Sequence, residues 1–91
     1  MKVQHQVTLA IGSNQGNRLE NIEQCLQLIH QEVGTVVRVS SLYESPSWGF
    51  ESDAFYNCAV LIHTFSEAEV VLNQILELEK TLGRVRLNLE G

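Results

Sequence analysis

The stretch "FYNCAVLIHT", residues 55 to 64, alternates between two sets of side chains along its whole length. The first set is apolar and consists of Tyr56, Cys58, Val60 and Ile62; the second is mixed and consists of Phe55, Asn57, Ala59, Leu61 and His63. Successive side chains of a β-strand point to opposite faces of its sheet, so this alternation predicts a strand with one face in the core. The strand therefore decides which side chains the fold buries.

Two further strands are predicted upstream. Over residues 4 to 11, Val7, Leu9 and Ile11 alternate with polar or small residues, which is typical of a strand with one dry face. Residues 35 to 43 are rich in β-branched side chains and favour a second strand. A long loop is then expected before the strand at 55 to 64.

Two helices are indicated by apolar residues spaced three and four apart. The first is predicted over residues 17 to 32, with Asn17 in a capping position. The second is predicted over residues 67 to 82, with Ser66 as the first residue of a capping box and Gly83 just past the end. Each helix thus has a start signal and one apolar face.

The resulting order, β-α-β-β-α, predicts an α+β fold that is ferredoxin-like, with the fourth strand and the C-terminal part missing. Both helices of such a unit cover one face of an antiparallel sheet, so the face bearing Phe55 and Asn57 is expected to stay open. The missing strand would pair beside the first strand, whose edge at residues 7 to 11 is therefore expected to be unpaired. Residues 1 to 91 are assigned to a single domain.

Composition excludes several classes of function. The net charge of -5 opposes binding to nucleic acid or to an anionic membrane, and the apolar run near the N-terminus is too short for a signal peptide or a spanning helix. A cytoplasmic protein is therefore expected. Cys25 and Cys58 lack metal-site spacing and lie in periodic apolar segments, so they are expected to be buried free thiols. The three histidines are too scattered to predict a metal site.

The aromatic segment "YESPSWGFESDAFYN", residues 43 to 57, is the strongest candidate for a ligand site. Phe55 and Asn57 are expected on the open face, where a ring can stack on a flat heterocycle and an amide can offer donors and acceptors. Pro46 and Trp48 would stiffen and enlarge the rim. Pattern alone leaves a lid over the local core as an equally good interpretation.

Two other segments suggest phosphate contacts. The turn Gly12 to Asn17 could present backbone N–H groups at a helix N-terminus, although it lacks the lysine of a P-loop. Arg84 and Arg86 are separated by one residue, so an extended backbone would direct both the same way. On spacing alone, a purely structural role is the stronger interpretation for both segments.

The motifs "AIGSNQGNRLENI", "SSLYESPSWG", "FYNCAV" and "LELEKTLGRVR" resemble, in order and spacing, the N-terminal half of the 6-hydroxymethyl-7,8-dihydropterin pyrophosphokinase family of folate biosynthesis. The resemblance covers about residues 7 to 86. It implies a ferredoxin-like fold and transfer of pyrophosphate from ATP, with Mg²⁺, to the hydroxymethyl oxygen of a reduced pterin, releasing AMP.

The resemblance also implies roles for individual residues. A pterin site would be formed by Asn14, Ser45, Pro46, Trp48, Phe55 and Asn57. Phe55 would stack on the pterin and Asn57 would read its amino-pyrimidinone edge. Glu79 would lie near the nucleotide, and Arg84 and Arg86 would bind ATP phosphates as nucleotide-binding and catalytic residues.

The family pattern continues with an aromatic-Gly-Pro-Arg segment and two aspartates that hold magnesium. The sequence here instead reads "RVRLNLEG" over its last eight residues, 84 to 91. A truncated and inactive form is therefore expected, with no metal ligands of its own, since pyrophosphoryl transfer depends on metal ions. Its unpaired first strand would favour a homo-oligomer. The alternative is a non-catalytic ferredoxin-like module for ligand binding or self-assembly.

Overall fold

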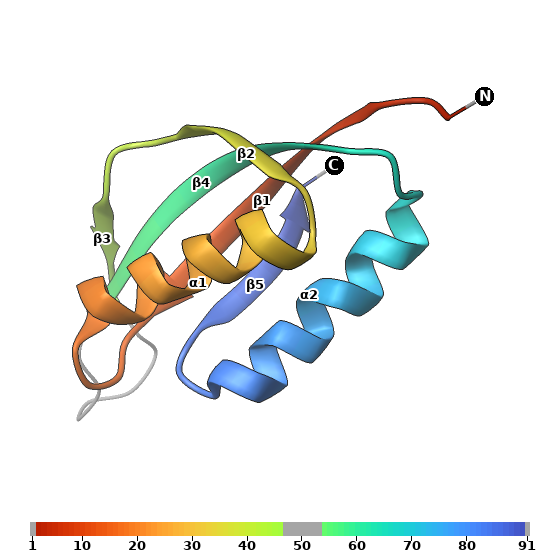
Figure 1. Cartoon of the computed structure of the whole chain (residues 1–91). Coiled ribbons are helices and arrows are strands. Elements are labelled where there is room, and N and C mark those ends of the chain that lie inside the picture. Colours follow the sequence, from red (N-terminus) through yellow and green to blue (C-terminus); the bar gives the residue numbers. More distant parts are fainter. Residues whose placement is uncertain (1, 47–53, 91) are drawn as a thin grey trace.

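The structure, a computed structural model, describes residues 2–46 and 54–90 of the chain (Figure 1). Its elements follow one another as β1 (His5–Ser13), α1 (Arg18–Glu32), β2 (Thr35–Val39), β3 (Tyr43–Ser45), β4 (Phe55–Thr64), α2 (Ala68–Leu82) and β5 (Arg86–Glu90). The fold is α+β, with one antiparallel sheet and two helices. None of the described helices is long and apolar enough to cross a membrane.

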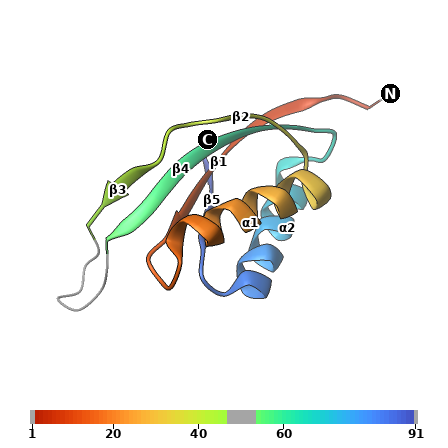
Figure 2. The same cartoon turned by 60° about the vertical axis from the view of Figure 1, so that its left-hand side comes forward.

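The sheet has the strand order β2-β4-β1-β5, and the short strand β3 also pairs with β4. Figures 1 and 2 show both helices on the same side of this sheet. The core lies between the two layers, and its fully buried side chains include Leu9, Ile11, Ile22, Ile29, Val60, Ile62, Val71 and Ile75. Within residues 2–46 and 54–90, no helix covers the opposite face of the sheet.

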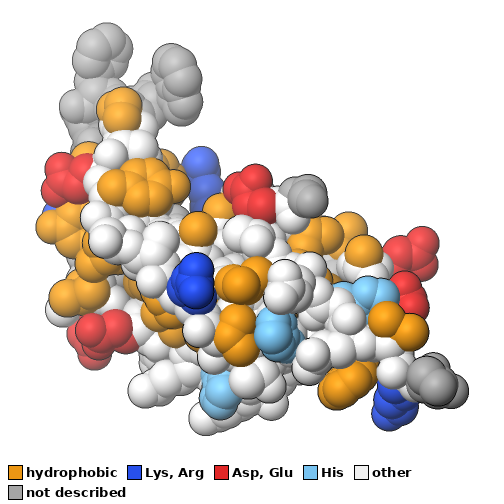
Figure 3. All heavy atoms as spheres, turned by 90° about the horizontal axis from the view of Figure 1, so that it is seen from above, with side chains coloured by type: hydrophobic (Ala, Val, Ile, Leu, Met, Phe, Trp, Pro, Cys, Tyr) orange, Lys and Arg blue, Asp and Glu red, His pale blue; other side chains and the backbone are white. Residues whose placement is uncertain are grey.

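The two-faced character predicted for residues 55 to 64 is confirmed in β4. Cys58, Val60 and Ile62 are buried beneath the helices, whereas Asn57 and Ala59 alternate with them and are only partly buried. Figure 3 shows the face away from the helices, where hydrophobic side chains, other uncharged side chains and backbone make up most of the surface and charged side chains are few. The open face expected from the alternation is therefore present.

The two cysteines are confirmed as buried free thiols. Burial raises the pKa of Cys25 from 9.0 to about 12, and the neighbouring Cys58 thiol contributes to this increase. Burial also raises the pKa of Cys58. Both thiols stay protonated in the core because their ions would lose hydration there.

The ends of the helices were predicted in part. Asn17 caps α1, and its Oδ1 accepts a hydrogen bond from the backbone N–H of Glu20 at 3.0 Å. The capping box predicted at Ser66 is wrong: the N-cap of α2 is Glu67, whose side chain makes no capping bond. Thr64 explains the difference, because its Oγ1 accepts the Ser66 N–H at 3.0 Å and holds that residue in the preceding turn.

The prediction of a missing fourth strand is wrong. Residues 86–90 form β5, which pairs antiparallel with β1 from Gly12↔Arg86 to Thr8↔Glu90. Val85 and Leu87 are buried while the residues between and after them are exposed, so the segment has the alternation of a strand with one dry face. β1 therefore has neighbours on both sides, and the unpaired edge on which the homo-oligomer was predicted does not exist.

The second predicted strand, over residues 35 to 43, is interrupted. β2 ends at Val39 and β3 begins at Tyr43, and the pairing of β2 with β4 shifts register between Val36 and Arg38. Ser40 occupies the break, and its Oγ accepts a hydrogen bond from the backbone N–H of Ala59 at 2.8 Å. Both pieces pair with β4. The second piece, β3, lies beside the end of β4 that starts at Phe55.

Candidate functional site

Four strands place residues side by side at one end of the sheet. Tyr43 of β3 is opposite Asn57 of β4, Asn57 is opposite Gly12 of β1, and Gly12 is opposite Arg86 of β5. Directly opposed residues of antiparallel strands point to the same face, which here is the open face. Because Gly12 has no side chain, the row has a gap between Asn57 and Arg86.

The gap is the floor of a hollow of about 220 Å³, which we call the Asn57 pocket. Its lining residues are Ala10, Ile11, Gly12, Tyr43, Ser45, Pro46, Phe55, Asn57, Arg86 and Asn88. A Cβ atom at Gly12 would lie 3.0 Å from Oδ1 of Asn57 and 3.4 Å from the Phe55 ring. The glycine thus creates the space, and Ala10 on the same strand extends it.

The amide of Asn57 is held by its neighbours. Its Nδ2 donates to Oγ of Ser45 at 2.8 Å and to the carbonyl of Tyr43 at 3.2 Å. These bonds identify the nitrogen and fix the orientation of the amide plane. The carbonyl oxygen of the side chain is consequently directed over Gly12, into the pocket.

A second hollow adjoins the first. We call it the arginine pocket; its volume is about 180 Å³, and its lining residues are Gly12, Asn14, Gln15, Phe55, Gly83, Arg84, Val85 and Arg86. Gly12, Phe55 and Arg86 line both pockets, so these residues form a shared wall. The Arg86 Cζ lies 4.7 Å from the centroid of the Phe55 ring.

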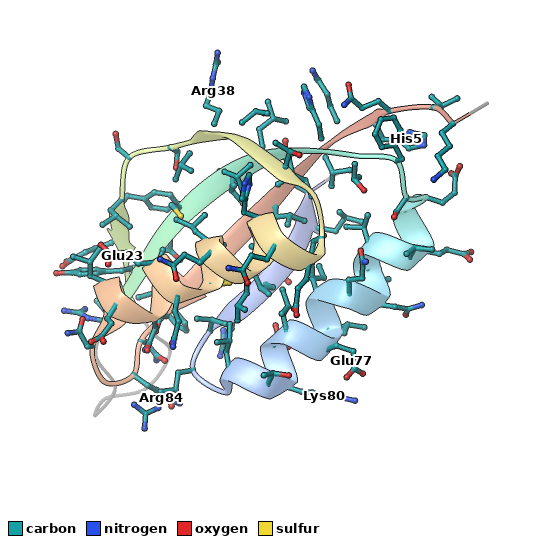
Figure 4. All side chains as sticks on the ribbon, viewed as in Figure 1. His5, Glu23, Arg38, Glu77, Lys80 and Arg84 are labelled. Atoms are coloured by element: carbon teal, nitrogen blue, oxygen red, sulfur yellow. The ribbon has the colours of Figure 1, made fainter. Side chains whose placement is uncertain are left out.

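Arg84 lines the arginine pocket together with Phe55 and Arg86. Figure 4 shows it at the end of α2, beside the turn that joins β1 to α1. A Cβ atom at Gly16, whose φ is 60°, would lie 3.1 Å from Nη1 of Arg84. The turn and the arginine therefore contact each other closely, and the two guanidinium groups give the pocket positive charge.

Arg18 lines neither pocket but supports the segment that carries Phe55, and the sequence analysis missed it. Its Nη1 donates to the carbonyl of Ala54 at 2.7 Å, and its Cζ lies 3.9 Å from the centroid of the Tyr56 ring. Arg18 thereby connects the start of α1 to Ala54 and Tyr56, the residues before and after Phe55. The sequence contained a signal for this role: a cation in the first turn of a helix is electrostatically unfavourable, so Arg18 would need another partner.

The structure brings most of the predicted residues together, but in two groups. Ser45, Pro46, Phe55 and Asn57 line the Asn57 pocket, whereas Asn14 lines the arginine pocket with Arg84 and Arg86. Trp48 lies outside the described residues. Glu79 lines neither pocket, and its Oε2 accepts the backbone N–H of Leu87 at 2.8 Å, which supports the start of β5.

The model of the family described as "7,8-dihydro-6-hydroxymethylpterin-pyrophosphokinase (HPPK)" matches residues 8–91. This chain belongs to that family. A relative from Bacillus subtilis, 2-amino-4-hydroxy-6-hydroxymethyldihydropteridine pyrophosphokinase, is 40% identical over 80 residues, which are 86% of this chain and 48% of that protein. The enzyme of the same name from Porphyromonas gingivalis is 32% identical over 81 residues, or 88% of this chain and 55% of the relative.

The chain thus spans about half the length of the curated relatives it matches. Within multifunctional relatives its share is smaller: it is 35% identical to the folate synthesis bifunctional protein of Arabidopsis thaliana and covers 16% of it. The names of these relatives agree with the pyrophosphokinase of folate biosynthesis suggested by the motifs.

Two solved structures support the fold alone. A protein of unknown function from Galdieria sulphuraria matches 96% of this chain and 48% of its own with a TM-score of 0.63 at 12% identity. The ACT domain from GTP pyrophosphokinase of Chlorobium tepidum matches 97% of this chain and 88% of its own with a TM-score of 0.56 at 10% identity.

The donor groups of the two pockets suit phosphates better than metal ions. Guanidinium groups bind phosphate oxygens, whereas Mg²⁺ prefers carboxylate oxygens. No carboxylate of residues 2–46 or 54–90 lines either pocket, and these residues contain no group of three His, Cys, Asp or Glu side chains that could hold a metal. The described lining residues are therefore suited to an anion rather than to a metal ion.

Proposed function

We propose that this chain is the acceptor-binding part of a pyrophosphokinase of folate biosynthesis. Its substrate would be 6-hydroxymethyl-7,8-dihydropterin, bound in the Asn57 pocket, and the phosphates of ATP would lie in the arginine pocket. The observation that supports this proposal is the wall of Gly12, Phe55 and Arg86, which the two pockets share. Group transfer needs the acceptor oxygen beside the phosphorus atom, and adjoining pockets provide that arrangement.

In the acceptor pocket, the pterin would stack on Phe55, and Asn57 would bind the polar edge of the heterocycle. The Nδ2 atom already donates to Ser45 and Tyr43, so the oxygen Oδ1 would accept from N–H groups of the pterin. Ser45 would act by orienting the amide and Pro46 by closing the rim. Trp48 is proposed to contribute to the same rim.

On the donor side, Arg84 and Arg86 would bind the β- and γ-phosphates, and Asn14 lines the same pocket. During transfer, the hydroxymethyl oxygen forms a bond to the β-phosphorus, the bond from that phosphorus to the α,β-bridging oxygen breaks, and AMP leaves. The hydroxyl proton passes to solvent. The two guanidinium groups would stabilise the charge on the transferred group.

For these 91 residues alone, binding without turnover is proposed. Magnesium neutralises developing charge and aligns the reacting groups in phosphoryl transfer, and the described residues hold no carboxylate cluster for it. We propose that the chain binds the acceptor and the phosphates but does not catalyse transfer. Glu79 is proposed to act on the nucleotide side only by supporting β5.

Strand order and connections also favour the ferredoxin-like arrangement for this domain, because the two helix-containing connections lie on one face of the four-stranded order β2-β4-β1-β5. The alternative function is a non-catalytic module of this fold that binds another ligand or assembles with itself. Binding of a pterin separates the two possibilities.

The test is titration calorimetry of the chain with 6-hydroxymethylpterin. We expect saturable binding that weakens more than about tenfold in Asn57→Ala, since removing a partner of a polar ligand group costs about 1–3 kcal/mol. Asn73→Ala is the matched control, because Asn73 is exposed on α2. If the unchanged chain gives no heat of binding at high ligand concentration, the proposed acceptor site is wrong. If the chain forms AMP from ATP in a pterin-dependent reaction, the proposal that it does not catalyse transfer is wrong.

A further inference from the structure

A buried hydroxyl connects the two turns that border the arginine pocket. Ser13 ends β1 and is only 1% exposed. Its Oγ donates to the carbonyl of Arg84 at 2.7 Å and accepts from Nδ2 of Asn21 at 3.1 Å. The same Nδ2 donates to the carbonyl of Gln15 at 2.8 Å. One serine and one asparagine therefore link β1, the β1–α1 turn, α1 and the α2–β5 turn.

The strand alternation of β1 explains why this hydroxyl is buried. Leu9, Ile11 and Ser13 share the face that is covered by the helices, so the serine stands where a third apolar residue would continue the pattern. A polar side chain at such a position is stable only when its hydrogen bonds are satisfied. The bonds to Arg84 and Asn21 satisfy both the donor and the acceptor of the hydroxyl.

Other bonds restrain the α2–β5 turn from within its own segment. Gly83 adopts the left-handed conformation with φ of 70°, and its N–H donates to the carbonyl of Glu79 at 2.9 Å. Leu87 donates its N–H to Oε2 of Glu79. These local bonds shape the turn, whereas the bond from Ser13 sets its distance from the β1–α1 turn, 71 residues away in sequence.

We propose that Ser13 is a positioning residue for polyphosphate binding, acting through the backbone of Arg84. By holding that carbonyl, it keeps the side chain of Arg84 against Gly16 and places both arginines on the border of one pocket. Asn21 assists by orienting the hydroxyl and fixing the turn at Gln15. The proposal rests on the proposed function in one respect: the arginine pocket must be the phosphate site.

The experiment compares Ser13→Ala with Thr64→Val in the 91-residue chain. Thr64 is the matched control, because its hydroxyl is also buried and bonded to a backbone group, the N–H of Ser66, but it lies at the end of β4 away from Phe55. Two properties are measured below the thermal transition of every variant. One is the order of the backbone amides of Arg84 and Val85, from ¹⁵N relaxation, and the other is the affinity for inorganic tripolyphosphate, from calorimetry.

For Ser13→Ala we expect disorder at Arg84 and Val85 and an affinity for tripolyphosphate about fivefold to tenfold lower, the equivalent of one lost hydrogen bond. Thr64→Val should change neither property. In a background of Arg84→Ala, adding Ser13→Ala should weaken tripolyphosphate binding little further, because the two residues act in one chain of contacts. Asn21→Ala should reproduce part of the Ser13→Ala effect.

The outcomes separate the positioning role from the proposed function. If Ser13→Ala leaves the turn ordered and binds tripolyphosphate as the unchanged chain does, the positioning role is overturned. If the unchanged chain binds no tripolyphosphate while Ser13→Ala still loosens the turn, the phosphate site fails and the structural link stands. Equal losses in Ser13→Ala and Thr64→Val would assign the effect to general loss of stability and also overturn the proposal.

Discussion

The guanidinium group of Arg86 lies over the ring of Phe55, with 4.7 Å between Cζ and the ring centroid. The two residues belong to β5 and β4, which flank β1, so the arginine reaches across the central strand. This reach is possible because Gly12, the residue of β1 opposite Arg86, has no side chain. One pair thus joins an aromatic surface suited to a heterocycle with a charge suited to a phosphate.

The first prediction concerns the charge of Arg86. In Arg86→Met the side chain can still cover Phe55, so binding of 6-hydroxymethylpterin should change less than about threefold. Binding of tripolyphosphate should weaken about tenfold or more, since a charge-assisted hydrogen bond is worth about 1.5–3 kcal/mol. Calorimetry with each ligand measures both effects. If the affinities for the two ligands fall equally, the charge of Arg86 does not act on phosphate binding alone.

The second prediction concerns the floor of the Asn57 pocket. In Gly12→Ala the new methyl group would lie 3.0 Å from Oδ1 of Asn57 and 3.4 Å from Cδ1 of Phe55. It would occupy the space where a heterocycle must lie, so affinity for 6-hydroxymethylpterin should fall more than about tenfold while the thermal transition remains cooperative. Fluorescence titration with the pterin measures the affinity. Unchanged affinity would place the ligand elsewhere.

The third prediction contrasts two glycines that follow the helices. A Cβ atom at Gly34 would lie 2.7 Å from the backbone oxygen of His63, which cannot move without disturbing β4, so Gly34→Ala should lower the free energy of unfolding by about 3 kcal/mol. At Gly83 the same atom meets open space, and only the left-handed backbone with φ of 70° is unfavourable, so Gly83→Ala should cost about 1 kcal/mol. Urea denaturation gives both values, and the reverse order would contradict the close contact at Gly34.

The fourth prediction concerns the pairing of β5 with β1. Because β1 has a hydrogen-bonded neighbour on each side, its amides from Thr8 to Gly12 should exchange with solvent as slowly as those in the centre of β4. Leu87→Ala removes a buried side chain of β5 and should destabilise the chain by about 2–4 kcal/mol. Hydrogen exchange measured by NMR tests the pairing directly. Fast exchange along β1 would restore the unpaired edge that the sequence suggested.

The fifth prediction follows from the raised pKa of Cys25. Below pH 9 the thiol is protonated in both states; between pH 9 and about 12 the unfolded chain loses this proton and the folded chain keeps it. The free energy of unfolding should therefore fall as the pH rises from 8 to 10, by about 1 kcal/mol from this residue. Cys25→Ala should show a shallower fall in urea denaturation. An equally steep fall would assign the pH dependence to other groups.

Local periodicity predicted much of this fold. The bounds of α1 and α2 follow from apolar spacing within about one residue, and β4 was placed correctly because its alternation is uninterrupted. The same alternation placed Phe55 and Asn57 together on the open face. Periodicity failed for β5, where the alternation of Val85, Leu87 and Leu89 was short and was interpreted as the end of a truncated segment.

The sequence by itself determined which side of each helix and strand is buried and which side chains stay on the open face, because apolar residues repeat with the period of a helix or a strand. Only the tertiary structure decided which of them meet. Register between strands depends on packing across the whole sheet, and it aligned Asn57, Gly12 and Arg86 in one row. The bond between Ser13 and Arg84 joins residues 71 positions apart, just beyond the pair Gly12 and Arg86 of β1 and β5, and no pattern local to either segment relates them.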